Sequence, residues 1–531
     1  MSIISVSNLT FAYEGSYDNI FTDVSFTLDT DWKLGFCGRN GRGKTTFLNL
    51  LMGKYKYIGN ISASVNFEYF PFQNMNHLEA GASTLEILMQ ITPESQLWQL
   101  EKELSKMEVT LDILDRPFST LSGGERTKAM LAALFLRENS FLLIDEPTNH
   151  LDMNGRQTIA RYLRGKSGFI LVSHDRDFLD DCVDHILSIN KTNIEVVSGN
   201  FSSWYHNKQR QDDFERAEND KLKKDIKRLE SAAKQSNAWA DKVESTKMGK
   251  GANKQRKKGH YGMDAMAYNG EKSRRMQQRR KNLERRQDTA INEKSQLLKN
   301  IEYAGKLKIH PLEYHAARLL ALDNIVIAYG EREICSEISF TLSKGDRLAL
   351  QGRNGSGKSS IMKLIAELGG VINAYPSISS DTSNISANIS PCASILANVN
   401  YSGLIHIGSR LVISYVPQDA TFLLGNLSDF AQAQQIDESL FKAILRKLDF
   451  SRVQFEKNMQ DYSSGQKKKV LIAASLCQKA HVYIWDEPLN YIDILSRIQI
   501  EELIAEYQPT MIFVEHDRAF CRNIATEILM L

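Results

Sequence analysis

The sequence predicts an α/β fold that is built twice, with a long antiparallel helical hairpin between the two copies. Three observations predict this arrangement: a set of motifs recurs in the same order, short apolar runs alternate with helical patterns in each copy, and the segment between the copies changes in composition. We therefore expect a first domain at residues 1–200, a helical linker at 201–312 and a second domain at 313–531.

Four pairs of motifs define the repeat. They are GRNGRGKTT (Gly38–Thr46) with GRNGSGKSS (Gly352–Ser360), LSGGERTK (Leu121–Lys128) with YSSGQKKK (Tyr462–Lys469), LLIDEPTNHLD (Leu142–Asp152) with YIWDEPLNYID (Tyr483–Asp493), and LVSHDRDF (Leu171–Phe178) with FVEHDRAF (Phe513–Phe520). The serine of the second motif precedes the first aspartate of the third motif by 23 residues in both copies. Equal order and spacing indicate two domains of the same kind.

The segment between the copies is expected to form two helices. Glycine is absent from His206 to Met248, and apolar residues recur at helical spacing on both sides of a glycine-containing stretch, Gly249–Gly270. The apolar residues are Leu222, Ile226, Leu229 and Ala233 before this stretch, and Met276, Leu283, Ala290 and Leu297 after it. Two such stripes around a helix-breaking turn predict an antiparallel hairpin.

Composition excludes several classes of protein. The 531-residue chain is 42% hydrophobic and 24% charged, and no apolar run approaches the roughly 18–20 residues that cross a membrane. The N-terminus has no basic region followed by an apolar core, so we expect no signal peptide. The six cysteines are scattered without a CxxC pair, which indicates reduced thiols and a cytoplasmic protein.

The first pair of motifs predicts two phosphate-binding loops. Both fit the pattern GxxxxGK[ST], in which glycines let main-chain N–H groups surround a phosphate at the N-terminus of a helix. Lys44 and Lys358 would reach the β- and γ-phosphates, and the hydroxyls of Thr45 and Ser359 would bind Mg²⁺. The other residues expected around the phosphates are Gly38, Asn40, Gly41, Gly43 and Thr46 in the first copy, and Gly352, Asn354, Gly355, Gly357 and Ser360 in the second.

The third and fourth pairs of motifs supply the reacting groups. The pairs Asp145–Glu146 and Asp486–Glu487 each follow a buried apolar strand; we expect the aspartates to hold Mg²⁺ and the glutamates to orient and polarise the attacking water. His174 and His516 are expected to contact the γ-phosphate. A lone histidine at such a place is more often structural, but these two lie 29 and 30 residues after the aspartates.

The second pair of motifs predicts an anion site that has no lysine or metal ligand of its own. A serine hydroxyl, free N–H groups and the positive end of a helix dipole would meet the anion there. The residues are Ser122, Gly123 and Gly124 in the first copy, and Ser463, Ser464 and Gly465 in the second.

Together these motifs resemble those of ATP-binding cassette (ABC) proteins, and the chain resembles two ABC-type P-loop NTPase domains in tandem. The resemblance implies ATP and Mg²⁺ as cofactors, and two composite sites within one monomer, because the signature segment of one domain completes the ATP site of the other. One site would join Lys44, Asp145, Glu146 and His174 to Ser463 and Gly465, and the other would join Lys358, Asp486, Glu487 and His516 to Ser122 and Gly124. ATP would hold the two domains together, and hydrolysis would release them.

The resemblance also implies residues for the adenine base. Tyr13 and Tyr329 each end an Ala-Tyr pair after the first strand of their copy and would stack on adenine. Taken as isolated tyrosines, they could equally be packing residues.

Two departures from the family pattern concern the metal and the signature. The Mg²⁺-sensing glutamine is Gln418 in SYVPQD, whereas EYFPFQN in the first copy has Phe72 at the corresponding position, and we take Gln73, one residue later. Ser464 stands where the first signature has a glycine, which would hinder close approach of the main chain to a phosphate. The two sites are therefore expected to hydrolyse ATP unequally.

Charge is sorted along the chain. From His206 to Asn300 there are 26 Lys+Arg against 14 Asp+Glu, although the whole chain has a net charge of +2. Such a run is usually a solvated helix face, but here the basic residues gather around the turn of the hairpin, which favours a phosphate backbone as partner. The residues expected to contact RNA are Lys247, Lys254, Arg256, Lys257, Lys258, Tyr261, Arg274, Arg275, Arg279 and Arg280.

Tandem domains joined by a charged two-helix linker resemble the ABC-F family of ribosome-binding ATPases over the whole chain. The resemblance implies the ribosome as partner, at the tRNA exit-site region, with contacts to large-subunit rRNA and P-site tRNA. Lys44 and Ser122 are 78 residues apart, which leaves little room for the added arm of housekeeping members. The chain is more similar to the Lsa- and Vga-type resistance proteins, which protect the peptidyl-transferase centre from lincosamides, streptogramin A and pleuromutilins.

Three other hypotheses remain open. A housekeeping ABC-F translation factor would bind ribosomes without conferring resistance. The soluble ATPase of an exporter would co-fractionate with membranes, and a DNA-handling ABC ATPase would turn over faster with DNA. These hypotheses are distinguished by identifying what sediments with the ATP-locked protein from cells, whether ribosomes, membranes or DNA.

Overall fold

The computed structural model describes residues 2–14, 19–72, 82–149, 151–190, 193–248, 307–329, 332–353, 355–369 and 399–531. It divides into two compact units, one formed by Met1–Trp204 with Ala304–Leu531 and the other by Tyr205–Tyr303. The first unit holds both copies of the repeat, which we call the first half (up to Asn200) and the second half (from Leu307).

A six-stranded sheet forms the centre of the first half, with the strand order β5-β6-β7-β3-β8-β9. Neighbouring strands are parallel except for the antiparallel pair β8 and β9. The inner strands β6 and β7 are almost wholly apolar and buried, as expected for a parallel sheet that is covered on both faces. The strands are β3 (Lys33–Cys37), β5 (Asn66–Phe70), β6 (Ser140–Asp145), β7 (Phe169–Val172), β8 (His185–Asn190) and β9 (Asn193–Ser198).

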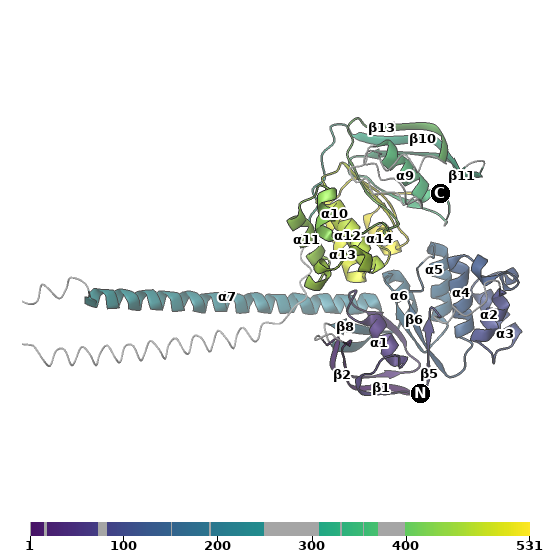
Figure 1. The fold of residues 1–531 in the computed structure, drawn as a ribbon, viewed down its shortest axis with the longest axis horizontal. Helices are drawn as coiled ribbons and strands as arrows, with labels where there is room; N and C mark the ends of the chain where they lie inside the picture. Colours follow the sequence, from purple (N-terminus) through teal and green to yellow (C-terminus); the bar gives the residue numbers. More distant parts are fainter. Residues whose placement is uncertain are drawn as a thin grey trace, which may run out of the picture. The chain divides into compact units, whose positions relative to one another are not determined.

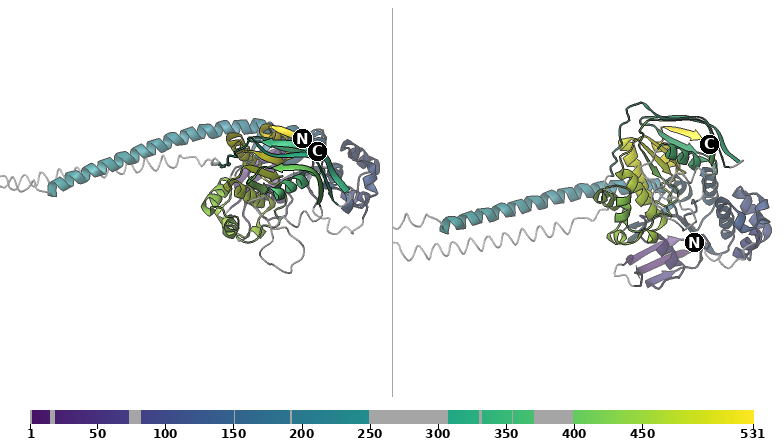
Figure 2. Two further views of the ribbon diagram at one scale, coloured as in Figure 1. Left: turned by 90° about the horizontal axis from the view of Figure 1, so that it is seen from above. Right: turned by 45° about the horizontal axis from the view of Figure 1, so that its top comes forward.

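An antiparallel sheet of order β2-β1-β4 completes the first half and is drawn in purple near the N-terminus in Figure 2. It shares one hydrophobic core with α1 and the central sheet. The strands are β1 (Ile3–Phe11), β2 (Phe21–Asp29) and β4 (Ile58–Ser62), and the helices of this half are α1 (Lys44–Leu51), α2 (Thr84–Ile91), α3 (Leu97–Lys106), α4 (Gly123–Leu134), α5 (Met153–Arg164) and α6 (Arg176–Cys182), with 3-10 turns η2 (Leu111–Leu114) and η3 (Phe118–Thr120).

The second half repeats this plan. A parallel sheet of order β14-β15-β16-β12-β17 lies at its centre, beside an antiparallel sheet of order β11-β10-β13. The strands are β10 (Arg318–Tyr329), β11 (Arg332–Ser343), β12 (Arg347–Gln351), β13 (Val399–Ile407), β14 (Ile413–Val416), β15 (Val482–Asp486), β16 (Met511–Val514) and β17 (Glu527–Met530). The helices are α9 (Lys358–Leu368), α10 (Leu427–Ala433), α11 (Glu438–Lys447), α12 (Ser464–Cys477), α13 (Ile494–Tyr507) and α14 (Arg518–Ile524), with 3-10 turns η5 (Arg452–Glu456) and η6 (Met459–Asp461).

The topology brings three motifs of each half to one edge of its parallel sheet. The phosphate-binding loops follow β3 and β12, the Asp-Glu pairs end β6 and β15, and the histidines follow β7 and β16. These strands are parallel neighbours, so their carboxyl ends meet at the same edge, where open α/β sheets bind ligands. The predicted α/β fold, built twice, is confirmed.

The helix α7 (Phe201–Met248) follows the first half without a break and is the first helix of the predicted hairpin (Figures 1 and 2). Its first turn belongs to the core of the first half, because Phe201 and Trp204 are buried and the main-chain N–H of Ser202 donates to Oδ1 of Asp180 in α6 at 2.8 Å. The second predicted helix lies outside the described residues. Across the described ranges, no helix has the length and apolar character needed to cross a membrane.

Candidate functional site

Each phosphate-binding loop ends at a glycine in a left-handed conformation. Gly43 (φ 94°) and Gly357 (φ 90°) stand immediately before α1 and α9. A Cβ atom on Gly43 would lie 2.6 Å from Cγ2 of Ile20, and one on Gly357 would lie 2.9 Å from Sγ of Cys335. Both the backbone angle and the lack of space therefore require glycine at these two positions.

The lysines of the two loops are buried and bend back onto their own loops. Nζ of Lys44 donates to the carbonyl oxygen of Gly38 at 2.7 Å, and Nζ of Lys358 donates to that of Gly352 at 3.0 Å. Burial lowers the pKa of both lysines. A phosphate anion in the loop would favour the charged form of each lysine, so binding and charge would reinforce each other.

The predicted metal ligands lie together in both halves. Oγ1 of Thr45 donates to Oδ2 of Asp145 at 3.0 Å, and Oγ of Ser359 donates to Oδ1 of Asp486 at 3.1 Å. Within the described part of the chain, the other carboxylate oxygen of Asp486 is buried and has no hydrogen-bond partner. A hydroxyl beside a carboxylate with an unused oxygen is a donor set that suits Mg²⁺.

The two glutamates that follow these aspartates lie beside the predicted histidines. Oε1 of Glu146 is 3.1 Å from Nε2 of His174, and Oε1 of Glu487 is 3.5 Å from Nε2 of His516. Both glutamates have positive φ angles, 53° and 46°. This conformation costs a residue with a Cβ atom roughly 1–3 kcal/mol, and such strain is found where a side chain must be aimed at a reacting group.

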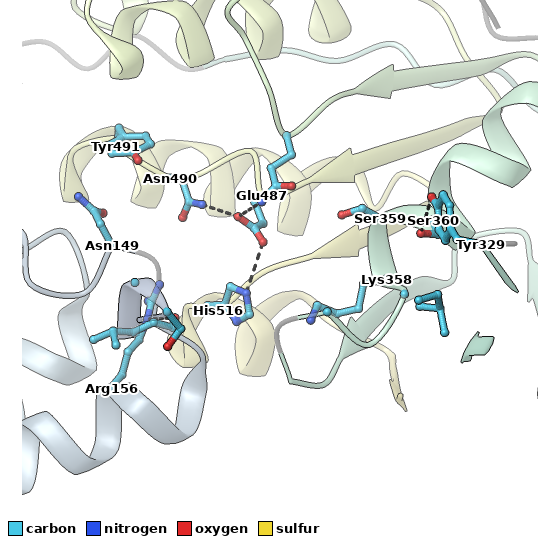
Figure 3. Close-up of a pocket in the computed structure, with 17 residues that line it drawn as sticks. Asn149, Arg156, Tyr329, Lys358, Ser359, Ser360, Glu487, Asn490, Tyr491 and His516 are labelled. Atoms are coloured by element: carbon cyan, nitrogen blue, oxygen red, sulfur yellow. Dashed lines mark hydrogen bonds and ion pairs between the residues drawn. The ribbon is translucent and has the colours of Figure 1, made fainter. Parts of the chain in front are cut away.

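Glu487 receives two further hydrogen bonds on Oε2. Nε2 of Gln418 donates at 2.9 Å and Nδ2 of Asn490 donates at 2.7 Å; the Asn490 bond and the His516 contact are drawn in Figure 3. Gln418, which was predicted to sense Mg²⁺, is thus hydrogen-bonded to the glutamate that follows the predicted metal ligand Asp486. Asn490 was missed by the sequence analysis, although its place three residues after Glu487 in a repeated motif was a usable signal.

The electrostatic surroundings of the two glutamates differ. Burial, with a further contribution from the charge of Asp145, raises the pKa of Glu146. Burial would also raise the pKa of Glu487, but the hydrogen bonds from His516 and Gln418 lower it to about 2. Glu487 is therefore held as a carboxylate, the form in which it can polarise a water molecule.

The signature segments form the N-termini of α4 and α12. Oγ of Ser122 accepts the N–H of Glu125, and Oγ of Ser463 accepts the N–H of Gln466. Each serine caps its helix, so its hydroxyl proton remains able to donate to an anion. Ser464 is the first residue of α12 and leaves the cap in place.

A cavity of about 620 Å³ is lined by residues of both halves (Figure 3). Ser122 and Gly123 reach it from the first half, and Lys358, Ser359 and Glu487 reach it from the second. Gly124, which was also predicted for this site, is not among its lining residues. The remaining lining residues are Asn149, Leu151, Arg156, Tyr329, Ile334, Gly355, Gly357, Ser360, Gln418, Asn490, Tyr491 and His516.

The loop that carries Lys44 also contacts the opposite half. Nδ2 of Asn40 donates to the carbonyl oxygen of Tyr491 at 2.8 Å. A Cβ atom on Gly465 would lie 2.3 Å from that oxygen and 3.0 Å from Nδ2 of Asn40, so only glycine fits beside the loop. Gly465 of the second signature is thus placed against the phosphate-binding loop of the first half.

The two predicted adenine-binding tyrosines have similar surroundings. The hydroxyl of Tyr13 is 2.8 Å from Oγ1 of Thr46, and that of Tyr329 is 3.2 Å from Oγ of Ser360. Their exposed fractions are 43% and 40%. Each ring is therefore fixed beside the helix after its phosphate-binding loop while part of it stays open, as stacking on a base requires.

Several predicted residues cannot be placed. Lys247 lies in α7, but its side chain is not described. The following lie outside the described residues: Gln73, Asn354, Lys254, Arg256, Lys257, Lys258, Tyr261, Arg274, Arg275, Arg279 and Arg280.

The chain belongs to the ABC transporter family, whose model matches residues 21–149 and 335–490. The two matches contain the phosphate-binding loops and the Asp-Glu pairs, and together they cover more than half of the chain. The protein is therefore an ATPase with two ATP-binding domains in tandem, as the motifs predicted.

Its relatives match the chain over nearly its whole length. The ribosome protection protein VmlR of Bacillus subtilis (strain 168) is 26% identical over 537 residues, covering 100% of this chain and 86% of that protein. The putative ATP-binding protein YdiF of the same organism is 25% identical, covering 100% and 80%, and the ATP-binding protein Uup of Buchnera aphidicola is 26% identical, covering 99% and 80%. These matches confirm the predicted likeness to ABC-F ATPases and to ribosome protection proteins.

Solved structures share the tandem fold. The archaeal ribosome recycling factor aABCE1, solved in complex with the ribosomal stalk protein aP1, has a TM-score of 0.59 and 18% identity, covering 98% of this chain and 87% of that one. A structure of RNase-L Inhibitor has a TM-score of 0.58 at the same identity, covering 99% and 87%. At this identity the likeness concerns the fold alone.

Proposed function

We propose that this protein is a ribosome-binding ATPase that protects the peptidyl-transferase centre from antibiotics of the lincosamide, streptogramin A and pleuromutilin type. The observation that carries the proposal is the match, over the whole chain, to a relative whose name is ribosome protection protein. Two ATP-binding halves and a long helix that leaves the first of them are the parts that such an activity needs.

ATP would bind between the halves and hold them together. At the Lys358 site, the lysine and the N-terminus of α9 would bind the phosphates, and Ser122 at the start of α4 would reach the same anion from the opposite half. Mg²⁺, held by Ser359 and Asp486, would neutralise charge on the phosphate oxygens. Glu487 would orient and polarise the attacking water, with His516 beside it.

The linker would carry this cycle to the ribosome. The 48 residues of α7 span about 70 Å at 1.5 Å per residue. From Lys242 to Arg286 the sequence has 15 Lys+Arg against 4 Asp+Glu, which suits large-subunit rRNA and P-site tRNA at the exit-site region. Tyr261 and its neighbours at the turn would pack against bases, so that basic residues dock the hairpin while the turn disturbs the antibiotic site.

Replacing Lys247–Gly270 with a short Gly-Ser turn tests the proposal. Basal ATP hydrolysis and much of the ribosome binding should remain, because the cassettes and the remaining basic residues are untouched, whereas protection should be lost. Growth of a sensitive host is measured at graded lincosamide or pleuromutilin concentrations, together with pelleting of the protein with ribosomes.

A matched control replaces Pro376–Pro391, a polar segment of the second half, with the same turn and should keep resistance. Full resistance without residues 247–270 would disprove the proposed role of the hairpin. Ribosome pelleting without resistance from the intact protein would identify a housekeeping translation factor. Co-sedimentation with membranes or DNA instead would point to an exporter or to a DNA-handling enzyme.

A further inference from the structure

A buried lysine of the second half binds two loops of the Lys358 site. Lys468 lies in α12 and is 4% exposed. Its Nζ donates to the carbonyl oxygen of Pro417 at 3.1 Å and to that of Glu487 at 3.0 Å. The first carbonyl immediately precedes Gln418, and the second belongs to the glutamate proposed to activate water. Both main-chain segments are thus tied to α12 through one side chain.

The same helix begins at the other ATP site. Lys468 is five residues, little more than one helical turn, from the signature residue Ser463. Gly465 of that signature lies against Asn40 in the phosphate-binding loop that carries Lys44. A shift of α12 when nucleotide binds beside Lys44 would therefore move the Nζ group that holds Glu487.

The first half has a different residue at this position. Where the second signature motif has Lys468, the first has Thr127, which has no cationic group. A second position changes as well: the second half has Glu515 before its histidine, where the first half has Ser173. Glu515 is 3% exposed, accepts the N–H of Leu489 at 2.8 Å and helps to offset the charge of Lys468.

A buried lysine is costly unless anions compensate it, and Asp486, Glu515 and Glu487 supply that compensation for Lys468. Nζ of Lys468 thus donates charge-assisted hydrogen bonds to the two main-chain segments that carry Gln418 and Glu487.

We propose that Lys468 is a positioning residue through which nucleotide bound at the Lys44 site sets the rate of hydrolysis at the Lys358 site. Because the first half has Thr127 instead, the coupling runs in one direction. The proposal rests on the role given above to Glu487, and not on the ribosome. Turnover by a protein that lacks both catalytic glutamates would disprove that role independently of this test.

The test isolates one ATP site at a time. In a Glu146→Gln background only the Lys358 site turns over, and in a Glu487→Gln background only the Lys44 site does. The variant K468T/E515S gives the second half the residue pair that the first half already has, and Arg497, which Glu515 also faces, keeps its ion pair with Asp517 at 3.0 Å. In the E146Q background it should lower kcat about 10- to 100-fold, the effect of a misplaced catalytic group, with KM for ATP unchanged. In the E487Q background kcat should stay within about twofold.

Coupling is read from a double-mutant cycle in the E146Q background. Ser463→Arg, which blocks the signature at the Lys44 site, should slow the Lys358 site when Lys468 is present and have no further effect in K468T/E515S. The proposal would be overturned if the effects of Ser463→Arg and K468T/E515S on kcat were additive. It would also be overturned if K468T/E515S lowered kcat equally in the E146Q and E487Q backgrounds, or left kcat unchanged in the E146Q background. Lys468→Arg should recover part of the rate, and if K468T/E515S fails to fold, Lys468→Gln is compared in the same two backgrounds.

Discussion

At the scale of single residues, two carboxylates are expected to decide whether bound ATP is hydrolysed. Glu146 and Glu487 follow the aspartates proposed to bind Mg²⁺, and both have a left-handed conformation within reach of a histidine. A glutamine in their place has the same shape and still accepts one hydrogen bond. It cannot accept a proton from water, so the substitution separates binding from chemistry.

Changing Glu146 and Glu487 together to glutamine should therefore lower ATP turnover by roughly 10²- to 10⁴-fold, the usual contribution of a general base. ATP binding, measured at equilibrium with a fluorescent nucleotide, should be kept. Glu138→Gln, at an exposed carboxylate of the first half, is the control and should turn over normally. Normal turnover by the double variant would remove these residues from the catalytic role.

Lys469 of the second half forms a buried ion pair, whereas the equivalent Lys128 of the first half is partly exposed. Nζ of Lys469 is 2.8 Å from Oδ2 of Asp493, with side-chain exposures of 4% and 0%. Burial would raise the pKa of Asp493, but the charge of Lys469 holds it well below its usual range. Removing the lysine would leave a buried carboxylate without its partner.

Lys469→Met should accordingly destabilise the second half by roughly 3–5 kcal/mol and lower its unfolding midpoint by roughly 6–20 °C. The matched control is Lys128→Met at the equivalent position, where the lysine is partly exposed. Its midpoint should change by less than about 2 °C. Differential scanning calorimetry measures both, and equal shifts would show that burial of the pair is not what matters.

At the scale of elements, each half contributes the N-terminus of one helix to the opposite half: the first half contributes that of α4 and the second half that of α12. Ser122 and Gly123 at the start of α4 line the same cavity as Lys358, whereas Gly465 in α12 lies against Asn40. A helix N-terminus binds an anion through free N–H groups that point along its axis. A bulky cation at this point should block the partner's site while leaving its own fold intact.

Ser122→Arg should thus abolish hydrolysis at the Lys358 site, and Ser463→Arg should do so at the Lys44 site. Photolabelling with 8-azido-ATP under turnover, followed by peptide mapping, assigns trapped nucleotide to Tyr13 or to Tyr329. If Ser122→Arg left the Lys358 site active and disabled the Lys44 site, the cross-paired arrangement would be wrong.

Sequence patterns predicted the elements well because the signals were local. The phosphate-binding loops, the apolar runs of β6 and β15 and the capped starts of α4 and α12 each lie within a dozen residues. The hydrogen bonds of Lys468 could not be predicted in this way, since its partner Pro417 lies 51 residues away and approaches only in the folded chain. The same holds for Asn40 and Tyr491, which are 451 residues apart.

At the scale of the whole molecule, charge is divided between the segment expected to meet RNA and the rest. His206–Asn300 has 26 Lys+Arg against 14 Asp+Glu, while the chain as a whole has a net charge of +2. Binding that depends on phosphate contacts releases counterions and weakens as salt rises. The salt dependence of ribosome binding therefore reports how many basic residues take part.

Neutralising Arg274, Arg275, Arg279 and Arg280 to glutamine should reduce the slope of log affinity against log salt by roughly 3, if each arginine contacts one phosphate. The control set is Lys56, Lys102, Lys457 and Lys479, four exposed lysines of the two halves. Ribosome pelleting between 50 and 300 mM salt, at roughly the range where such slopes are measured, gives both values. An equal reduction of the slope by the control set would assign the phosphate contacts to the two halves instead of the linker.

The root of α7 has a mechanical consequence. Asp180, which accepts a hydrogen bond from Ser202 in the first turn of α7, lies in α6, and α6 begins two residues after His174, which is predicted to contact the γ-phosphate. The whole helix has 48 residues and is about 72 Å long. Tilting it by about 10° about its first turn would move its far end through an arc of about 13 Å, given that length. A small rearrangement around the phosphates after hydrolysis would then be amplified into a large displacement of the far end of α7.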